Sequence, residues 1–247
     1  METAHILEEL AYDMGELPRE AIEAAIAKRG QIVPYLLKIL EDAVDRTDEL
    51  IEDENYQAHL YAIYLLAQFR EADAFPFVLK LISTPGDLPH AILGDVLTED
   101  LSRILASICS GNIEPLQDLI ENPQINEYVR AAALTSLVIL VGCGLQPRLP
   151  ILLYLKTLFN ERIERKPSFV WDTLVSSCCD LYPDEVFTEI SEAFSEGLID
   201  PSFITLEEIA KVVMERKEKH LFTLFQKAEL IEDTLSEMEK WLSAYNN

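Results

Sequence analysis

The side chains that could hold a metal or attack a substrate are few and scattered along the chain. No histidine lies in an H-E-x-x-H pattern or at ligand spacing from a cysteine; the four are His5, His59, His90 and His220. The four cysteines contain no C-x-x-C pair, and three of them lie in apolar surroundings, as reduced cytosolic thiols do. The sequence therefore predicts no metal, no cofactor and no catalytic residue.

Glycine patterns that bind phosphate or expose a nucleophile are also missing. The sequence has no G-x-S-x-G, G-x-x-x-x-G-K or G-x-G-x-x-G motif, and Gly142-Cys143-Gly144 is a lone doublet. Cys143 has no base near it in the sequence, so the doublet indicates the end of a helix. With 8 glycines in 247 residues, the chain lacks the turn residues that nucleotide-binding α/β folds and all-β folds use.

Acidic side chains are the most distinctive charged feature. Lys and Arg total 20 against 44 Asp and Glu, for a net charge of −24, which argues against nucleic-acid binding and against a polybasic membrane contact. Carboxylates crowd the stretch 41–54, with Arg46 the one cation among them and without the residue order of a calcium loop. Two interpretations stay open: a solvated linker, or a docking surface for a basic protein. The candidate partner-binding residues are Asp45, Asp48, Glu49, Glu52, Asp53, Glu54 and, at the start of the next helix, His59.

The elements that carry these residues are predicted to be helical throughout. Pro18 is placed as a first-turn proline, Gly30 as a helix stop, Asn126 as an N-cap, and Thr205 with Glu208 as a capping box. No stretch shows period-2 alternation with hairpin turns. A hydrophobic share of 49% is enough for a packed core. We therefore predict an all-α protein.

The predicted helices also pair. A shorter helix with an early proline is followed by a longer one rich in alanine and leucine, and the prolines Pro34, Pro76, Pro115 and Pro150 are 42, 39 and 35 residues apart. Periods near 40 with two helices each are typical of HEAT or armadillo-like α-solenoids, and the drift in spacing indicates degenerate repeats. A compact helical bundle is the alternative.

The clearest repeat, 114–140, resembles the HEAT consensus. It has a proline-led helix, a short turn, and V-R-x-A-A-x-x-x-L from Val129 to Leu137. The resemblance implies that Arg130 contacts the turn of an adjacent repeat. A wider resemblance over about 56–205, most specific at 98–109 and 112–119, is to a bacterial family of unknown function with HEAT-like repeats. Its members commonly end in a zinc-binding SEC-C tail, but the last cysteine here is Cys179, so no zinc is expected.

The C-terminal segment carries a heptad pattern of apolar residues. They are spaced alternately three and four apart and predict one amphipathic helix over 220–245: Leu221, Leu224, Ala228, Ile231, Leu235, Met238, Leu242 and Tyr245. This seam must be covered, either by capping the end of its own solenoid or by pairing with a second copy in a homodimer or with a partner helix. We divide the chain into a HEAT-like repeat domain, 1–219, and a C-terminal amphipathic helix, 220–247.

These patterns predict a non-enzymatic, cytoplasmic scaffold that binds another protein. The N-terminus lacks the basic and apolar regions of a signal peptide, and the uncharged run 131–147 is too short to span a bilayer. The alternative is an enzyme or small-ligand binder with a pocket in the concave face, as the resemblance implies because some HEAT-like proteins act as lyases.

Overall fold

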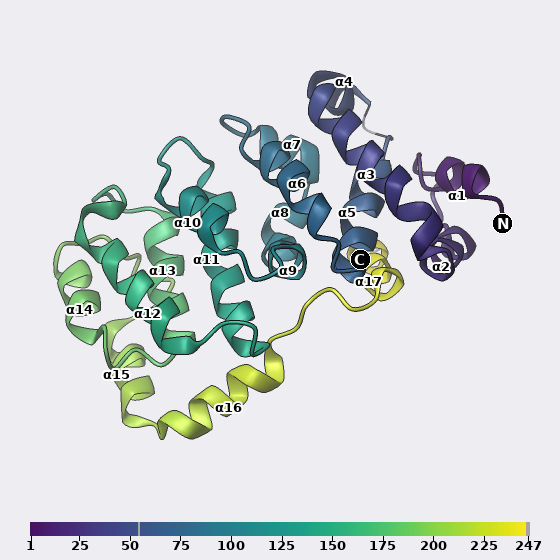
Figure 1. Ribbon diagram of the computed structural model, residues 1–247. Helices are drawn as coiled ribbons and strands as arrows, with labels where there is room; N and C mark the ends of the chain where they lie inside the picture. The colour runs from purple at the N-terminus through teal and green to yellow at the C-terminus, as the bar shows by residue number, and fades with distance from the viewer. Residues whose placement is uncertain (54, 246–247) are drawn as a thin grey trace.

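The computed structural model describes residues 1–53 and 55–245, and every regular element in that part is a helix (Figure 1). An isolated antiparallel bridge joins Tyr12 to Tyr56. The all-α prediction is therefore confirmed. The elements are α1 Thr3–Glu9, α2 Arg19–Ala27, α3 Arg29–Asp45, α4 Thr47–Glu52, α5 Ala58–Gln68, η1 Ala72–Ala74, α6 Phe75–Ile82, α7 Leu88–Leu93, α8 Val96–Glu99, α9 Leu101–Ile108, α10 Glu114–Glu121, α11 Glu127–Gly142, α12 Arg148–Thr157, η2 Leu158–Arg162, α13 Phe169–Asp180, α14 Phe187–Ser195, α15 Leu206–Met214, α16 Lys217–Lys227 and α17 Thr234–Tyr245.

The helices form an elongated array with the N-terminal helices at one end and α14 and α15 at the other (Figure 1). Helix α5 packs on α9, α9 on α11, and α11 on α13, so these four make a continuous row. Helices α3, α10 and α12 pack beside the row, against α5, α11 and α13. No helix in 1–53 and 55–245 is long and apolar enough to cross a bilayer.

The row helices have the sequences that their positions require. Helix α11 is buried along nearly its whole length because it touches neighbours on several sides, and it is apolar all round rather than on one stripe.

Two predicted helix caps are present: the Asn126 side chain accepts a hydrogen bond from the Tyr128 amide at 2.9 Å, and Thr205 and Glu208 form the capping box. Both caps satisfy amides that the helix itself leaves free.

The glycine expected to stop a helix does not do so. Gly30 lies in the first turn of α3, and the break falls at Lys28, between α2 and α3. A first-turn amide has no partner within the helix in any case, so glycine is tolerated there.

The C-terminal helix predicted over 220–245 is also wrong as a single element. The structure has two helices, α16 and α17, joined by the extended segment 228–233. The reason lies in contacts with distant parts of the chain. Ser107 Oγ accepts a hydrogen bond from the Ile231 amide at 3.0 Å. Arg103 donates to the carbonyl of Leu230, and Arg70 donates to the carbonyl of Ile231. These bonds replace the helical ones that 228–233 would otherwise make.

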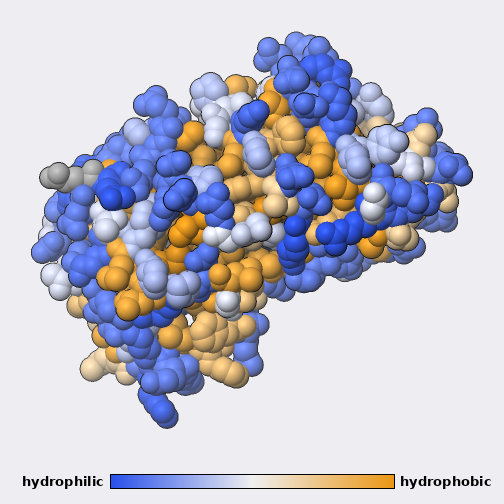
Figure 2. Space-filling view, in the orientation of Figure 1, coloured by the Kyte–Doolittle hydropathy of each residue, from blue (hydrophilic) through white to orange (hydrophobic). Residues whose placement is uncertain are grey.

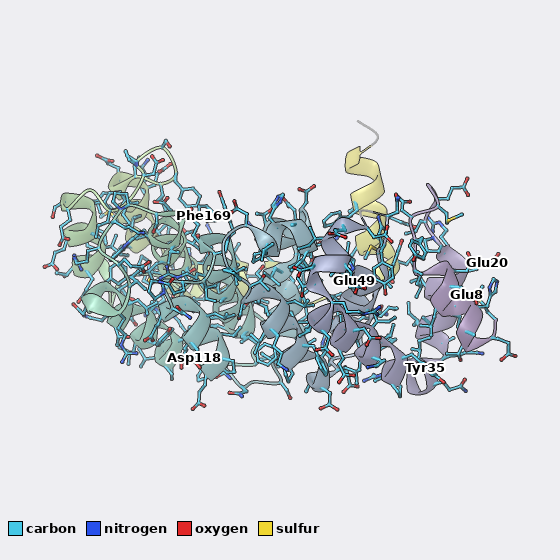
Figure 3. The ribbon with its side chains drawn as sticks, turned by 90° about the horizontal axis from the view of Figure 1, so that it is seen from above. Glu8, Glu20, Tyr35, Glu49, Asp118 and Phe169 are labelled. Carbon is cyan, nitrogen blue, oxygen red and sulfur yellow. The ribbon has the colours of Figure 1, made fainter. Side chains whose placement is uncertain are left out.

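The C-terminal segment, 216–245, returns across the row of helices. Helix α16 packs on α11 and α13, and α17 contacts α2 and α5. Figure 3 shows α17 on the opposite side of the array from Tyr35 and Asp118. Of the heptad residues, Ile231 and Met238 are buried, and Leu221, Leu224 and Leu235 are half-buried. The side chain of Leu242 lies outside the described part.

Gly142, at the end of α11, lies directly against the end of α16. A Cβ at this position would overlap Ala228 Cβ and crowd Leu224, whereas a Cβ at Gly30 would meet nothing within 4 Å. We expect Gly142→Ala to lower the free energy of unfolding by about 1–3 kcal/mol, despite the better helix propensity of alanine, because Ala228 has no flexible atoms to move aside.

The matched control is Gly30→Ala, the same change in an open helical position. It should raise the free energy of unfolding by up to about 1 kcal/mol. Urea unfolding of both variants measures the two effects, and stabilisation by both would show that α16 does not pack on α11 at this distance.

An ion-pair cluster fixes the start of α16. Arg148 donates to both oxygens of Glu185, at 2.8 and 2.6 Å, and Lys217 binds Asp184 at 3.0 Å and Glu185 at 2.9 Å. The Arg148 guanidinium holds the pKa of the Glu185 carboxyl well below its usual value. A glutamate with a depressed folded pKa stabilises the fold above its unfolded pKa and loses that contribution as the pH falls.

Replacing Glu185 by glutamine should therefore have an effect that depends on pH. We expect a loss of about 1 kcal/mol at neutral pH, since the pair is part-buried. The difference in the free energy of unfolding between wild type and variant should disappear as the pH falls below about 4.3. Urea unfolding across this range measures it, with Glu192→Gln on the exposed face of α14 as the control. A difference in unfolding free energy that stays constant with pH would contradict a stabilising role for ionised Glu185 in this cluster.

Candidate functional site

Helix α4 presents carboxylates to solvent and buries none of its residues. We call Asp45, Asp48, Glu49, Glu52 and Asp53 the α4 acidic surface; the first four are exposed and Asp53 is half-buried. Arg46 is the cation among them, 3.6 Å from Glu49 and 3.8 Å from Asp42. Figure 2 shows hydrophilic residues covering the top of the molecule over α4. The sixth predicted carboxylate, Glu54, lies outside the described residues.

A cavity of about 630 Å³ opens next to this surface, and we call it the N-terminal cavity. Its walls come from the loop after α1, from α4 and the connector after it, from α5, from the segment 91–96, and from α17. The carboxylates that line it are Asp13, Glu16 and Asp53, and the large aromatic residues are Tyr56, Tyr61, Tyr64 and Trp241. A smaller cavity of about 330 Å³ adjoins it, shares Leu50, Asp53 and Tyr56, and includes Arg46.

Backbone pairing fixes one wall of the N-terminal cavity. The Asp13 amide donates to Asn55 O and the Gln57 amide to Ala11 O, both at 2.9 Å, on either side of the Tyr12–Tyr56 bridge. The two tyrosine rings meet edge to face, with centroids 5.6 Å apart. These contacts hold the loop after α1 against the start of α5, so carboxylates and aromatic residues from distant segments face one space.

His59 is a buried imidazole in the cavity wall. Its side chain stacks on Tyr56 with centroids 6.1 Å apart, and Nε2 lies 2.8 Å from Ile92 O. A carbonyl only accepts, so Nε2 carries the proton and Nδ1 is a free acceptor, for which the described residues offer no partner. Burial lowers the pKa of His59, which keeps the ring neutral.

The phenols in the wall stay protonated. Burial, and then the charge of Asp13, raise the pKa of Tyr61 to about 12. Burial and the nearby Asp100 raise the pKa of Tyr64 as well. The cavity therefore presents carboxylates, a neutral imidazole and neutral phenols. No group of three or more His, Cys, Asp or Glu side chains placed to hold a metal occurs within 1–53 and 55–245.

A buried polar cluster closes the cavity against α17. Tyr64 donates to Asp100 Oδ2 at 2.6 Å, and Trp241 Nε1 lies 3.3 Å from the same oxygen. Arg103 bridges Asp100, at 3.0 Å, and both oxygens of Glu237, at 2.9 and 2.8 Å. The cluster joins α5, α9 and α17, so α17 contributes Met238 and Trp241 to the wall from a fixed position.

Arg130 lies away from the cavity and joins neighbouring helix pairs. Its Nε donates to Ile120 O at the end of α10, at 2.9 Å, and its two terminal nitrogens bind Glu164 at 3.0 and 2.8 Å. Glu164 follows η2, between α12 and α13. The Arg130 guanidinium lowers the pKa of Glu164. The Arg130 side chain is only 5% exposed.

The structure therefore gathers some of the predicted residues and separates others. Asp53 and His59 line the N-terminal cavity, Glu49 lines the smaller one, and Asp45, Asp48 and Glu52 stay on the outer surface. Sequence reasoning missed Asp100, Arg103 and the carboxylates Asp13 and Glu16. The one signal for Arg103 is an opposite charge three residues earlier on a helix that is otherwise largely apolar.

Comparison with known proteins gives a family and no activity. The family model described as "Protein of unknown function (DUF1186)" matches residues 1–245. An "Uncharacterized protein" of Chlamydia muridarum (strain MoPn / Nigg) is 56% identical over 246 residues, 99% of this chain and 98% of that protein. A protein of the same description from Chlamydia trachomatis serovar D has the same identity and coverage. No solved structure matches the chain. The chain thus belongs to the DUF1186 family of proteins of unknown function.

Proposed function

We propose that the chain is a non-enzymatic, HEAT-like α-solenoid of degenerate two-helix repeats that binds a basic protein. The row of α5, α9, α11 and α13, each with a neighbouring helix, supports the solenoid, and Arg130 ties one helix pair to the next. The C-terminal segment packs on this row, which favours covering its own chain over pairing in a homodimer. The four cysteines are free thiols, which suits a reducing cytoplasm.

The observation that carries the proposal is the α4 acidic surface. A helix whose residues are all at least partly exposed contributes little to the core, so its carboxylates are free to meet a partner. The net charge of the chain, −24, adds to the negative potential of this surface. The surface therefore attracts a basic protein over several ångströms and repels acidic ones. The charge speeds encounter and selects the partner, while affinity comes from the contacts made afterwards.

The experiment is a crosslinked pull-down from bacterial lysate at low and high salt, with a neutralised bait. The bait variant combines Asp45→Asn, Asp48→Asn and Glu52→Gln. Its control removes the same number of charges from carboxylates that lie elsewhere on the array (Figure 3): Glu8→Gln, Glu20→Gln and Asp118→Asn.

We expect the wild-type and control baits to capture a basic protein at about 50 mM salt and to lose it at about 500 mM salt. The α4 variant should lose it at both. Equal capture by all three baits would contradict a docking role for this surface, and so would the absence of any specific protein.

A second candidate function, a small-ligand binder, is favoured by the N-terminal cavity. Its volume of about 630 Å³ falls within the range of small-molecule sites, about 300–1,000 Å³.

A further inference from the structure

We propose that the N-terminal cavity binds an organic cation, an ammonium or guanidinium group attached to an apolar body. The inference does not need the scaffold function and rests on the second candidate, small-ligand binding. Of the three cavity carboxylates, Asp13 and Glu16 lie outside the α4 acidic surface, and Asp53 belongs to both. The cation could be a free amine or the side chain of a lysine or arginine in a protein, and the experiment below separates these two sources.

The charged residues that line the cavity select a ligand with a positive charge. Every charged residue among the described cavity lining is a carboxylate: Asp13, Glu16 and Asp53. No lysine or arginine is among these lining residues; Arg46 reaches only the smaller neighbouring cavity, where Asp42 and Glu49 pair with it. Walls of one sign beside a low-dielectric interior focus the potential and concentrate counter-charges.

Aromatic walls select the kind of cation. Tyr56, Tyr61 and Trp241 line the same space as the carboxylates, and a cation is attracted to the face of an aromatic ring. The volume far exceeds that of a bare inorganic ion. Leu60, Ile92 and Met238 provide apolar surface for the rest of the ligand.

Two buried polar side chains of the wall, His59 and Tyr64, have already committed their hydrogen-bond donors. His59 is 4% exposed and lines the cavity, and its Nδ1 lacks a partner among the described residues while Nε2–H is committed to Ile92 O. The Tyr64 hydroxyl is committed as a donor to Asp100. A wall whose charged groups are all carboxylates suits a ligand that brings N–H donors, which ammonium and guanidinium groups do.

Binding should also stabilise α17. Met238 and Trp241 form part of the wall, so a ligand that contacts them binds the docked helix better than the detached one. Amide hydrogen exchange of α17 should therefore slow when a cation is added. This readout distinguishes occupation of the cavity from loose association of a cation with an acidic surface.

The test is calorimetric titration of the full chain with 2-phenylethylammonium. Its neutral isostere, 2-phenylethanol, and the anion phenylacetate report on charge. A blocked lysine tripeptide represents a protein side chain. The cavity variant is Asp13→Asn with Glu16→Gln, both exposed residues, and the matched control is Glu114→Gln with Asp118→Asn on α10. A third variant, Ala91→Trp, fills the cavity from an exposed position in α7 without changing the charge.

We expect saturable binding of the ammonium probe, weaker binding of the alcohol, and none of the anion. The cavity variant should bind about tenfold more weakly, the Glu114/Asp118 control should match wild type, and Ala91→Trp should not bind. Binding of the tripeptide at least as tight as that of the amine would assign the cation to a protein, and its failure to bind would assign it to a small molecule.

Three results would overturn the inference: no saturable binding of either cation to wild type, equal affinity for amine and alcohol, or an unchanged affinity in Ala91→Trp. The variant with Asp45→Asn, Asp48→Asn and Glu52→Gln leaves the cavity lining intact, so it should still bind the amine. A failure of the scaffold proposal is therefore distinguishable from a failure here.

Discussion

Replacing Arg103 by alanine is expected to lower the free energy of unfolding by about 3–5 kcal/mol. The guanidinium is 14% exposed and binds Asp100 and Glu237, whose side chains are 12% and 6% exposed. Without it, Lys240 is the one cationic partner that the described residues leave to the Glu237 carboxylate, and they leave the Asp100 carboxylate none. A buried carboxylate that loses its partner costs more than the ion pair itself contributes.

The effect should shrink at low pH. Burial opposes ionisation of Glu237, but hydrogen bonds from Arg103 and Lys240 outweigh it and hold the pKa of this carboxyl below its usual value. The stability that comes with a depressed pKa is lost as the pH falls through it, so wild type and variant should converge. Urea unfolding at neutral and acid pH measures this.

Arg46→Ala is the control. Arg46 is 58% exposed and pairs with exposed carboxylates, so its loss should cost no more than about 1 kcal/mol. If Arg103→Ala is as mild as this control, α17 is not held by the buried cluster.

The second large effect is expected at Ile231. Its side chain is 0% exposed, in the extended segment between α16 and α17, and Ile231→Ala should cost about 2–5 kcal/mol. Urea unfolding gives the magnitude, and faster amide exchange over 228–245 would show that the segment detaches first. Leu149→Ala, at a position 49% exposed in α12, is the control and should change stability by about 0.5 kcal/mol or less.

The same variant separates the two interpretations of the heptad pattern. If these residues cover the chain's own helices, Ile231→Ala destabilises a monomer. If they form a homodimer, the mass in solution halves and the stability of each protomer is retained. Because Arg103 and Ile231 both hold the C-terminal segment, the double variant should lose less stability than the two single variants together.

The helices were predictable because their signals are local. Periodicity, caps at Asn126 and Thr205, and scarcity of glycine depend on residues within one or two turns, and they were sufficient for the all-α class. The heptad over 220–245 is also local and would suit one helix. Its interruption at 228–233 comes from Ser107, Arg103 and Arg70, more than a hundred residues away in the sequence.

The candidate site was predictable only in part for the same reason. Asp53 and His59 were found through the acidic stretch and the helix that follows it. The N-terminal cavity needs segments near residues 13, 53, 61, 92 and 241 to meet, and no spacing rule links them. Trp241 in particular lies off the heptad seam, and its role follows only from where α17 docks.

The most direct test of the proposed function is the salt dependence of affinity for the basic protein that the wild-type chain captures. Calorimetry from about 50 to 500 mM salt would compare wild type with the Asp45/Asp48/Glu52 variant and with the Glu8/Glu20/Asp118 control. Wild type and control should bind tightly at low salt and weaken steeply as the salt rises. The variant should bind weakly at every salt concentration. An affinity that the variant retains in full, with the same salt dependence, would contradict a docking role for the α4 acidic surface.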